Sequence, residues 1–145
     1  MTPDERLVLL AAGEEPRMIA RMSSGFAVMG DSQLLPGYCL LLAYPKMGQL
    51  NALVGEERTR FLADMASLGD AVQRATGCLR VNYSIYGNLD PFLHAHVWPR
   101  TADEPESYRT SPPLSIPAEL RESVPYDEAV HGELRRAIGV FLSKE

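Results

Sequence analysis

The stretch that most limits how this chain can fold is PFLHAHVWP, residues 91–99. Its residues alternate between two kinds, as in a β-strand whose side chains point in turn to opposite faces of a sheet. Leu93, Ala95 and Val97 form the small, aliphatic face, which we expect to pack against a helix. The other face carries two histidines between two aromatic residues: Phe92, His94, His96 and Trp98. The fold must therefore cover one face of this strand and can leave the other for chemistry.

The remaining strand signals come in pairs. Segments 26–29 and 38–44 are apolar runs joined through a turn rich in Gly, Asp and Ser, which predicts one hairpin. Segment 78–86 precedes the histidine strand, and residues 87–90 connect the two. This arrangement predicts a second hairpin. The two histidines therefore lie on the second arm of a hairpin.

Three helices are predicted around these strands. Thr2 as N-cap, Pro3 at the first helical position and Glu5 three residues after the cap predict a short helix ending near Gly13. Apolar residues spaced by three and four predict a helix over 56–75 (Phe61, Met65, Leu68, Val72 and Ala75) that stops at Gly77, and a closing helix over about 127–143 (Val130, Leu134, Ile138 and Phe141). Residues 101–125 hold five of the eleven prolines and are predicted to be an irregular surface arm. We expect one domain over residues 1–145.

Composition narrows the function classes. A formal net charge of −5 argues against a nucleic-acid-binding surface, so any phosphate must be met locally. Cys39 and Cys78 lack the spacing of a disulfide framework or zinc site, and reduced thiols are expected. The start MTPDER is acidic and the apolar runs are too short to span a bilayer, so we expect a cytoplasmic protein without membrane contact.

The histidine pair leaves three interpretations open. Both rings can be half-buried structural groups. They can bind zinc, which would need a third ligand from Asp or Glu where the neighbours are aromatic. They can also work together, with one neutral imidazole attacking and the other donating a proton, which suits phosphoryl chemistry.

The wider stretch YGNLDPFLHAHVWPR, residues 86–100, resembles the signature of the histidine-triad (HIT) superfamily, in which three histidines alternate with apolar residues. LLPGYCLLLAYPKMGQL, residues 34–50, is similar to the family's Pro-Gly-His strand and turn. LVGEERTRFLADM, residues 53–65, is similar to its central helix. The resemblance covers about residues 20–102 and implies a two-layer α+β fold with an antiparallel sheet of about five strands. It also implies a homodimer joined through the helix of residues 56–75 and the sheet edge.

The resemblance implies nucleotide chemistry at this strand. His94 aligns with the middle histidine, which attacks the α-phosphorus of a nucleotide to give a nucleotidyl-histidine, and His96 aligns with the third. Because the transferase branch carries glutamine where this chain has His96, the resemblance favours hydrolysis of a dinucleoside polyphosphate, such as diadenosine tetraphosphate, or of a nucleoside phosphoramidate. The protein itself is expected to need no metal or cofactor, although a divalent cation could arrive with the nucleotide.

Two positions depart from the family pattern. Phe92 replaces the first histidine of the triad, which predicts a slower enzyme, and Tyr38 replaces the histidine of Pro-Gly-His. The paired cysteines that hold zinc in some members are absent, so no structural zinc is expected. The alternative hypotheses are a nucleotide-binding or sensing module with little or no turnover and, further off, a metal-binding protein.

Supporting residues follow from chemistry and alignment. Four are predicted to contact the nucleotide: Gly87 and Asn88 beside the nucleophile, Asn82 on the neighbouring strand, and Asp31 at the ribose. For Gly87, Asn88 and Asp31 the competing interpretation is a residue of a plain turn. For Asn82 it is a solvent-facing strand residue. Arg100 is interpreted as structural or rim-located rather than catalytic, and His131 as a surface residue.

Overall fold

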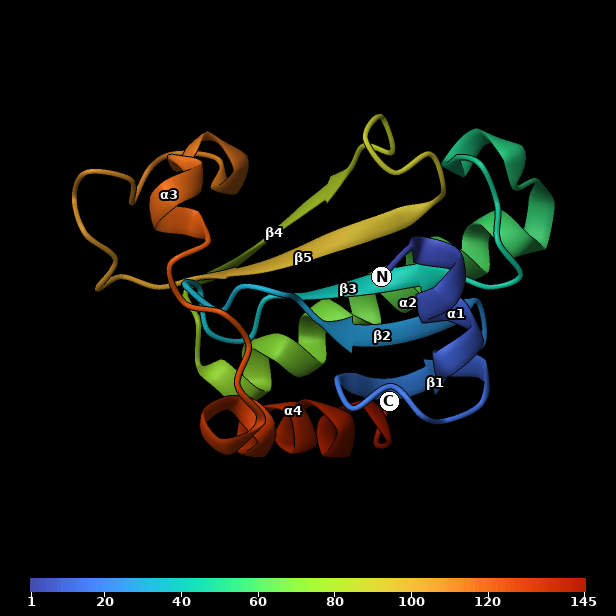
Figure 1. Cartoon of the computed structure of the whole chain (residues 1–145), viewed down its shortest axis with the longest axis horizontal. Coiled ribbons are helices and arrows are strands. Elements are labelled where there is room, and N and C mark those ends of the chain that lie inside the picture. Colours follow the sequence, from blue (N-terminus) through green and yellow to red (C-terminus); the bar gives the residue numbers. More distant parts are fainter.

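A computed structural model describes residues 1–145 as a five-stranded antiparallel sheet in the order β1-β2-β3-β5-β4 (Figure 1). The strands are β1 (Met18–Met22), β2 (Gly25–Met29), β3 (Cys39–Ala43), β4 (Arg80–Ile85) and β5 (His94–Arg100). β5 lies between β3 and β4, with His94 opposite Leu42 and His96 opposite both Leu40 and Ser84. The histidine strand is therefore interior to the sheet, and β1 and β4 are its edges.

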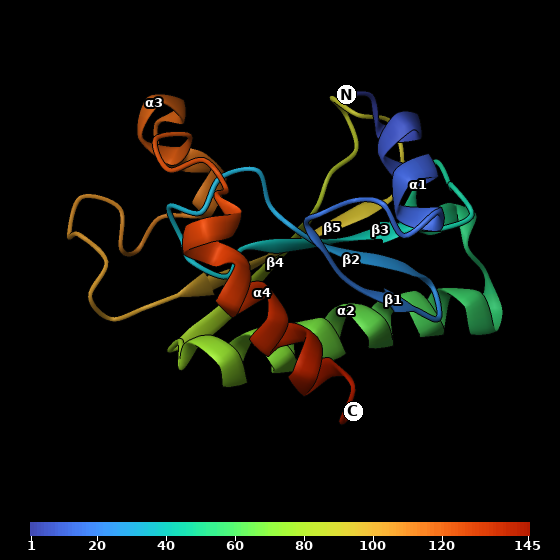
Figure 2. The same cartoon turned by 60° about the horizontal axis from the view of Figure 1, so that its bottom comes forward.

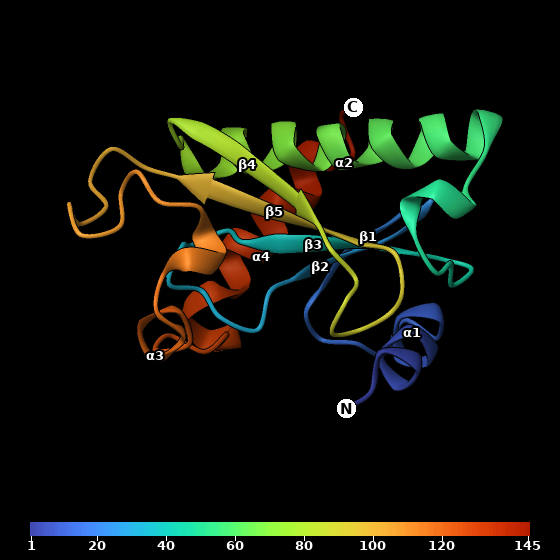
Figure 3. The same cartoon turned by 90° about the horizontal axis from the view of Figure 1, so that it is seen from above.

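Helices cover the two faces of the sheet unequally. α2 (Gly55–Thr76) and α4 (Glu128–Leu142) lie against one face, here called the lower face. α1 (Pro3–Ala11) and the arm of residues 101–125, which contains α3 (Ala118–Arg121), lie over the opposite, upper face (Figures 2 and 3). Short 3-10 turns at Leu50–Ala52 and Pro113–Ser115 complete the fold. None of the helices has the length and apolar character needed to cross a membrane.

The local signals in the sequence are confirmed. Thr2 and Glu5 form a reciprocal capping box at the start of α1. Gly77 ends α2 in the left-handed conformation, with a φ of 67° that a glycine adopts without a steric penalty. Leu93, Ala95 and Val97 are buried in the main core between the sheet and the two lower helices, together with Phe61, Leu68, Val72 and Ile138. The α+β fold with an antiparallel sheet is therefore as predicted.

Three expectations need correction. β1 was not predicted, because its five residues, MIARM, contain no sustained apolar alternation and are only partly buried. His131 is not a surface residue: it is 8% exposed, and its Nδ1 accepts a hydrogen bond from the Asp127 N–H at the start of α4. Val130 is 68% exposed, so the buried stripe of α4 runs through His131, Leu134 and Ile138 instead.

The upper face carries two separate apolar clusters. The first lies under α1 and ends at Phe92, two residues before β5 begins (Leu7, Leu10, Phe26, Val28, Leu42 and Phe92). The second lies under the arm and begins on β5 at Trp98 (Leu35, Tyr38, Trp98, Tyr108 and Ile116). His94 and His96 occupy the interval between them, so the interval is a gap in the apolar cover of the sheet.

Arg100 ties the arm to the end of β5. Its guanidinium forms a buried ion pair with Glu104, with side-chain exposures of 9% and 5%. The same guanidinium donates hydrogen bonds to the backbone carbonyls of Tyr108, Arg109 and Ser111 and to Asn82 Oδ1. The structure confirms the structural interpretation of Arg100, which fixes the path of residues 101–111 over the sheet.

We expect Arg100→Leu to lower the free energy of unfolding by about 3–5 kcal/mol, because it leaves the Glu104 carboxylate buried without its partner. The arm should also become cleavable by protease under native conditions. Thermal unfolding and limited proteolysis measure the two effects. Arg80→Leu, which changes an exposed arginine opposite Arg100 on β4, is the matched control. A variant as stable and as protease-resistant as the wild type would contradict the role given to Arg100.

Candidate functional site

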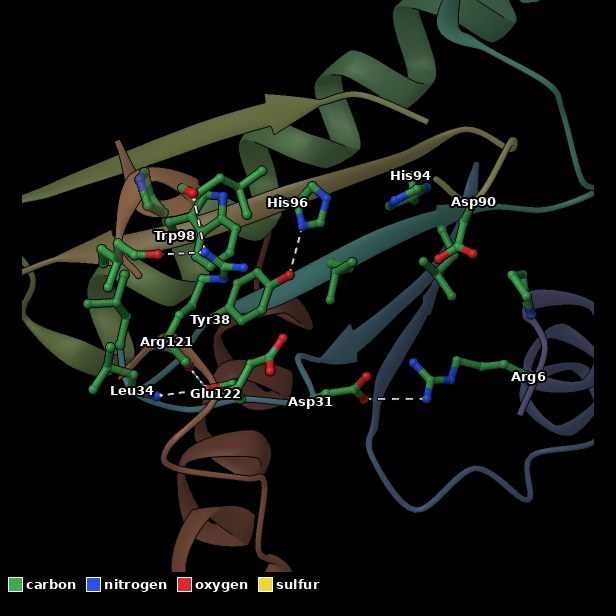
Figure 4. Close-up of a pocket in the computed structure, with 18 of the residues that line it drawn as sticks. Arg6, Asp31, Leu34, Tyr38, Asp90, His94, His96, Trp98, Arg121 and Glu122 are labelled. Atoms are coloured by element: carbon green, nitrogen blue, oxygen red, sulfur yellow. Dashed lines mark hydrogen bonds and ion pairs between the residues drawn. The ribbon is translucent and has the colours of Figure 1, made fainter. Parts of the chain in front are cut away.

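A cavity of about 330 Å³ opens on the upper face in the gap between the two apolar clusters. Its floor is made by Leu40, Leu42, His94 and His96 of the two central strands. Thr2, Pro3 and Arg6 of the α1 region line one side, and arm residues Pro113, Leu114, Ile116 and Arg121 line the other. Figure 4 shows the two histidines side by side above the labelled residues Tyr38 and Asp31.

His94 is held in a defined orientation. It is 8% exposed, and its Nδ1 lies 2.8 Å from the backbone carbonyl oxygen of Phe92. A carbonyl only accepts hydrogen bonds, so Nδ1 carries the proton in neutral His94 and Nε2 carries the lone pair. An imidazole in this tautomer can attack an electrophile through Nε2.

His96 lies next to His94, with the ring centroids 5.1 Å apart. Its Nδ1 is 2.7 Å from the hydroxyl oxygen of Tyr38. Burial raises the pKa of Tyr38, so the hydroxyl remains protonated and donates to Nδ1. Burial and then the neighbouring His94 lower the pKa of His96 from 6.5 to about 4. In the free protein His96 is therefore neutral near pH 7, with its proton on Nε2.

Tyr38 lines the cavity and contacts His96, although its sequence position indicates only a departure from the Pro-Gly-His motif. Its ring stacks on Trp98 at 3.8 Å between centroids and 2° between planes, and its hydroxyl meets His96. The signal available in the sequence was its place directly after Pro36-Gly37, at the start of a strand that pairs with the histidine strand. Tyr38 thus fixes the tautomer of the second histidine.

Phe92, which the motif resemblance aligns with the first triad histidine, makes an apolar contact with His94. Its ring stacks on His94 at 4.6 Å between centroids, and it is 5% exposed within the cluster beneath α1. Its side chain gives no hydrogen bond, but its carbonyl orients His94. The surroundings of residue 92 are therefore built for a hydrophobic side chain.

The residues predicted to hold a nucleotide lie in three different places. Asp31 lines the cavity opposite the histidines; desolvation would raise its pKa, but Arg17 and then Arg6 hold that pKa below its usual value. Gly87 and Asn88 belong to the connection before β5 and do not line the cavity. Asn82 faces a second cavity, with its Oδ1 engaged by Arg100.

The cavity offers no ready ligand set for a metal. Nowhere in the chain do three or more His, Cys, Asp or Glu side chains gather at metal-binding distance. Cys39 and Cys78 are free, buried thiols. The cavity instead presents two adjacent imidazoles whose hydrogen bonds within the protein use Nδ1 and leave Nε2 without a partner.

Comparison with known proteins bears on the fold. No protein-family model and no curated protein sequence matches the chain. Solved structures do match: a histidine-triad protein from Sinorhizobium meliloti has a TM-score of 0.73 at 18% identity, over 94% of this chain and 93% of that one. The chain has the histidine-triad fold.

Two further structures support the histidine-triad comparison. A histidine-triad protein from Marinobacter aquaeolei has a TM-score of 0.68 at 20% identity and covers 97% of this chain and 94% of its own. A hypothetical histidine-triad nucleotide-binding protein from Sulfolobus tokodaii has a TM-score of 0.72 at 11% identity and covers 95% and 91%. The resemblance first seen in the motif of residues 86–100 is confirmed for the histidine-triad fold.

We expect Phe92→His to lower stability without raising activity. The new imidazole would lie in an apolar cluster with no partner for at least one ring nitrogen, at a cost of about 1–3 kcal/mol. Thermal unfolding and turnover of a nucleotide substrate provide the measurements. Phe92→Leu, which stays apolar and keeps the backbone carbonyl, is the control for loss of the ring. A faster and equally stable Phe92→His variant would show that the position is still catalytic.

We expect the His96 ring to titrate near pH 4 in the free protein and at higher pH with AMP bound, because a phosphate stabilises the imidazolium. Since the folded pKa lies below the unfolded value, unfolding should become easier as pH falls from 6.5 towards 4, where only the unfolded chain gains this proton. NMR titration of the imidazole resonances measures both pKa values, with His96→Gln to assign them. A free-state midpoint at 6.5 or above would contradict this account.

Proposed function

We propose that this protein hydrolyses a nucleotide at its α-phosphate through a nucleotidyl-histidine intermediate. The observation that carries the proposal is the pair of oriented imidazoles: His94 presents an unprotonated Nε2 to the cavity, 5.1 Å between ring centroids from His96. The histidine-triad fold supports the same proposal, because one of the matched structures with this fold is described as a hypothetical nucleotide-binding protein. Substrates in view are a dinucleoside polyphosphate or a nucleoside phosphoramidate.

In the first step the lone pair of His94 Nε2 forms a bond to the α-phosphorus. The bond from phosphorus to the leaving oxygen or nitrogen breaks, and the leaving atom takes a proton from His96. Because His96 is neutral in the free protein, it has to be protonated when the anionic phosphate binds beside it. The Tyr38 hydroxyl can then turn to accept a hydrogen bond from Nδ1, so its contact with the ring survives the change of charge.

In the second step water attacks the same phosphorus and the phosphorus–Nε2 bond breaks. His96, neutral after the first step, accepts the proton of the water, and His94 regains its lone pair. The products are a nucleoside monophosphate and the protonated leaving group. These two steps require no metal or organic cofactor, although a divalent cation could accompany a polyphosphate.

A nucleotide-binding or sensing module with little or no turnover is the second candidate. The apolar residue Phe92 in place of a polar triad member favours it, as does the lowered pKa of His96, which reduces the fraction ready to donate a proton. The two candidates share the cavity and differ in chemistry. Turnover, measured with product identification over a panel of dinucleotides and phosphoramidates, separates them.

The homodimer and the cytoplasmic location expected from the sequence remain proposals. β4 is an edge strand, and it carries the exposed hydrophobic side chain of Tyr83. Such an edge is suited to pairing with a second copy. Sedimentation velocity on the intact chain would reveal a dimer, and a purely monomeric protein at micromolar concentration would rule it out.

We expect His94→Ala to lower kcat by about 1,000-fold or more with little change in AMP affinity, because the imidazole acts mainly in the transition state. Rapid quenching of the wild type should trap a covalent nucleotidyl group on His94, detected by peptide mass spectrometry. Unchanged thermal unfolding of the variant is the control for folding. Retention of more than about a tenth of kcat, which is less than ~1.4 kcal/mol of barrier, would reject His94 as nucleophile.

A further inference from the structure

A second cavity, of about 680 Å³, lies next to the candidate site on the same face of the sheet. The two cavities share Trp98, Pro113 and Leu114 in their linings. The second is floored by β4 and the end of β5 and walled by residues 109–114 of the arm. Because Asn82 and Ser84 lie opposite Trp98 and His96 in the β4–β5 ladder, their side chains share the upper face with the histidines.

His96 stands at the boundary between the two cavities. It lines the first, while its neighbours Tyr86 and Trp98 line the second, with ring centroids 6.3 Å and 5.4 Å from the His96 ring. His96 is also the group proposed to protonate the leaving atom. The leaving half of a substrate attacked by His94 is therefore placed to extend past His96 into the second cavity.

The two cavities differ in charge. The first carries two guanidiniums against three carboxylates: Arg6 and Arg121, with Asp31, Asp90 and Glu122. The second carries three arginines and no carboxylate: Arg80, Arg100 and Arg109. Glu104 neutralises Arg100, whereas the exposed Arg80 and Arg109 take part in none of the ion pairs of the protein. Two uncompensated positive charges thus lie in the second cavity of a chain whose net charge is −5.

Neutral donors add to these charges. The Asn82 Oδ1 accepts a hydrogen bond from Arg100, so its amide N–H groups remain available to a ligand. The hydroxyls of Thr110 and Ser111 also line the cavity. Guanidinium and amide N–H groups together form the donor set that recognises phosphate oxygens.

We propose that the second cavity binds the leaving half of the substrate and that this half is a phosphate-bearing group, held by Arg80, Arg109 and the Asn82 amide. The inference rests on the proposed function and selects within it a polyphosphate over a phosphoramidate of a small amine. Arg80 pairs with Arg100, which lies four residues after His96 on β5. At the rise of a strand, these four residues span about 13 Å. An ammonia leaving group cannot reach that far, whereas an extended nucleotide can.

The test compares two AMP donors, diadenosine tetraphosphate and adenosine 5′-phosphoramidate, in the wild type and in the double variant Arg80→Met with Arg109→Met. We expect kcat/KM for the tetraphosphate to fall about 100-fold, from the loss of two charge-assisted contacts, and that for the phosphoramidate to change less than about threefold. Arg74→Met, an exposed arginine in the last turn of α2 on the lower face, is the matched control and should change neither value. Equal effects on both donors, or no effect on either, would overturn the inference and leave the proposed function standing.

Calorimetry with inorganic tripolyphosphate tests the cavity independently of turnover. We expect binding to the wild type and to Arg74→Met, and at least tenfold weaker binding to the double variant. If the wild type hydrolyses neither donor, the proposed function fails, and this measurement alone decides whether the cavity is an anion site. Tripolyphosphate that fails to bind, or that binds the double variant as well as the wild type, would overturn the inference. Both arginines are exposed and unpaired, so an unchanged melting temperature is expected for all variants.

Discussion

The arm that walls both cavities depends on one guanidinium. Arg100 is the last residue of the histidine strand, and its contacts with Glu104, Asn82 and three backbone carbonyls convert the chain that follows into a fixed wall. Residues 113–122, beyond that anchor, supply the arm side of the first cavity, and residues 109–114 supply the wall of the second. A buried ion pair adds little net stability when compared with apolar packing. The Arg100–Glu104 pair instead holds the proline-rich arm in one conformation over the sheet.

The candidate site follows from how the upper face is covered. α1 and the arm each bury an apolar cluster; one includes Phe92, just before β5, and the other includes Trp98 on β5. Two imidazoles lie in the interval, where burial and then the neighbouring His94 lower the pKa of His96. The same packing that stabilises the fold therefore limits the water around the reactive groups. The candidate site and the packing of the upper face thus share four alternate residues, Phe92 just before β5 and His94, His96 and Trp98 on it.

Much of this architecture could be predicted from the sequence, because its signals are local. The alternation over residues 91–99 gave the buried and reactive faces, and the Thr2–Glu5 capping box gave the start of α1. β1 could not be seen, since a short edge strand with mixed residues forms by pairing with β2 rather than by its own pattern. His131 was misplaced because its burial depends on the packing of α4 against the rest of the chain.

The site was predicted less completely than the fold. His94 and His96 were found from their spacing, but the groups that set their protonation, the Phe92 carbonyl and the Tyr38 hydroxyl, are visible only in three dimensions. Asn82 lies in the neighbouring cavity rather than beside His94, because the β4–β5 register pairs it with Trp98. Long-range contacts of this kind leave no periodic signal in a sequence.

The hydrogen-bond partner of His94 Nδ1 is a main-chain carbonyl oxygen, which affects which sequences can orient a histidine in the same way. Any residue at position 92 supplies a carbonyl oxygen, so this hydrogen bond to His94 does not require a particular side chain there. The side chain at that position is then free to serve packing, as Phe92 does beneath α1. A motif search that demands three histidines would pass over chains of this kind, although the main-chain contact that orients His94 is present.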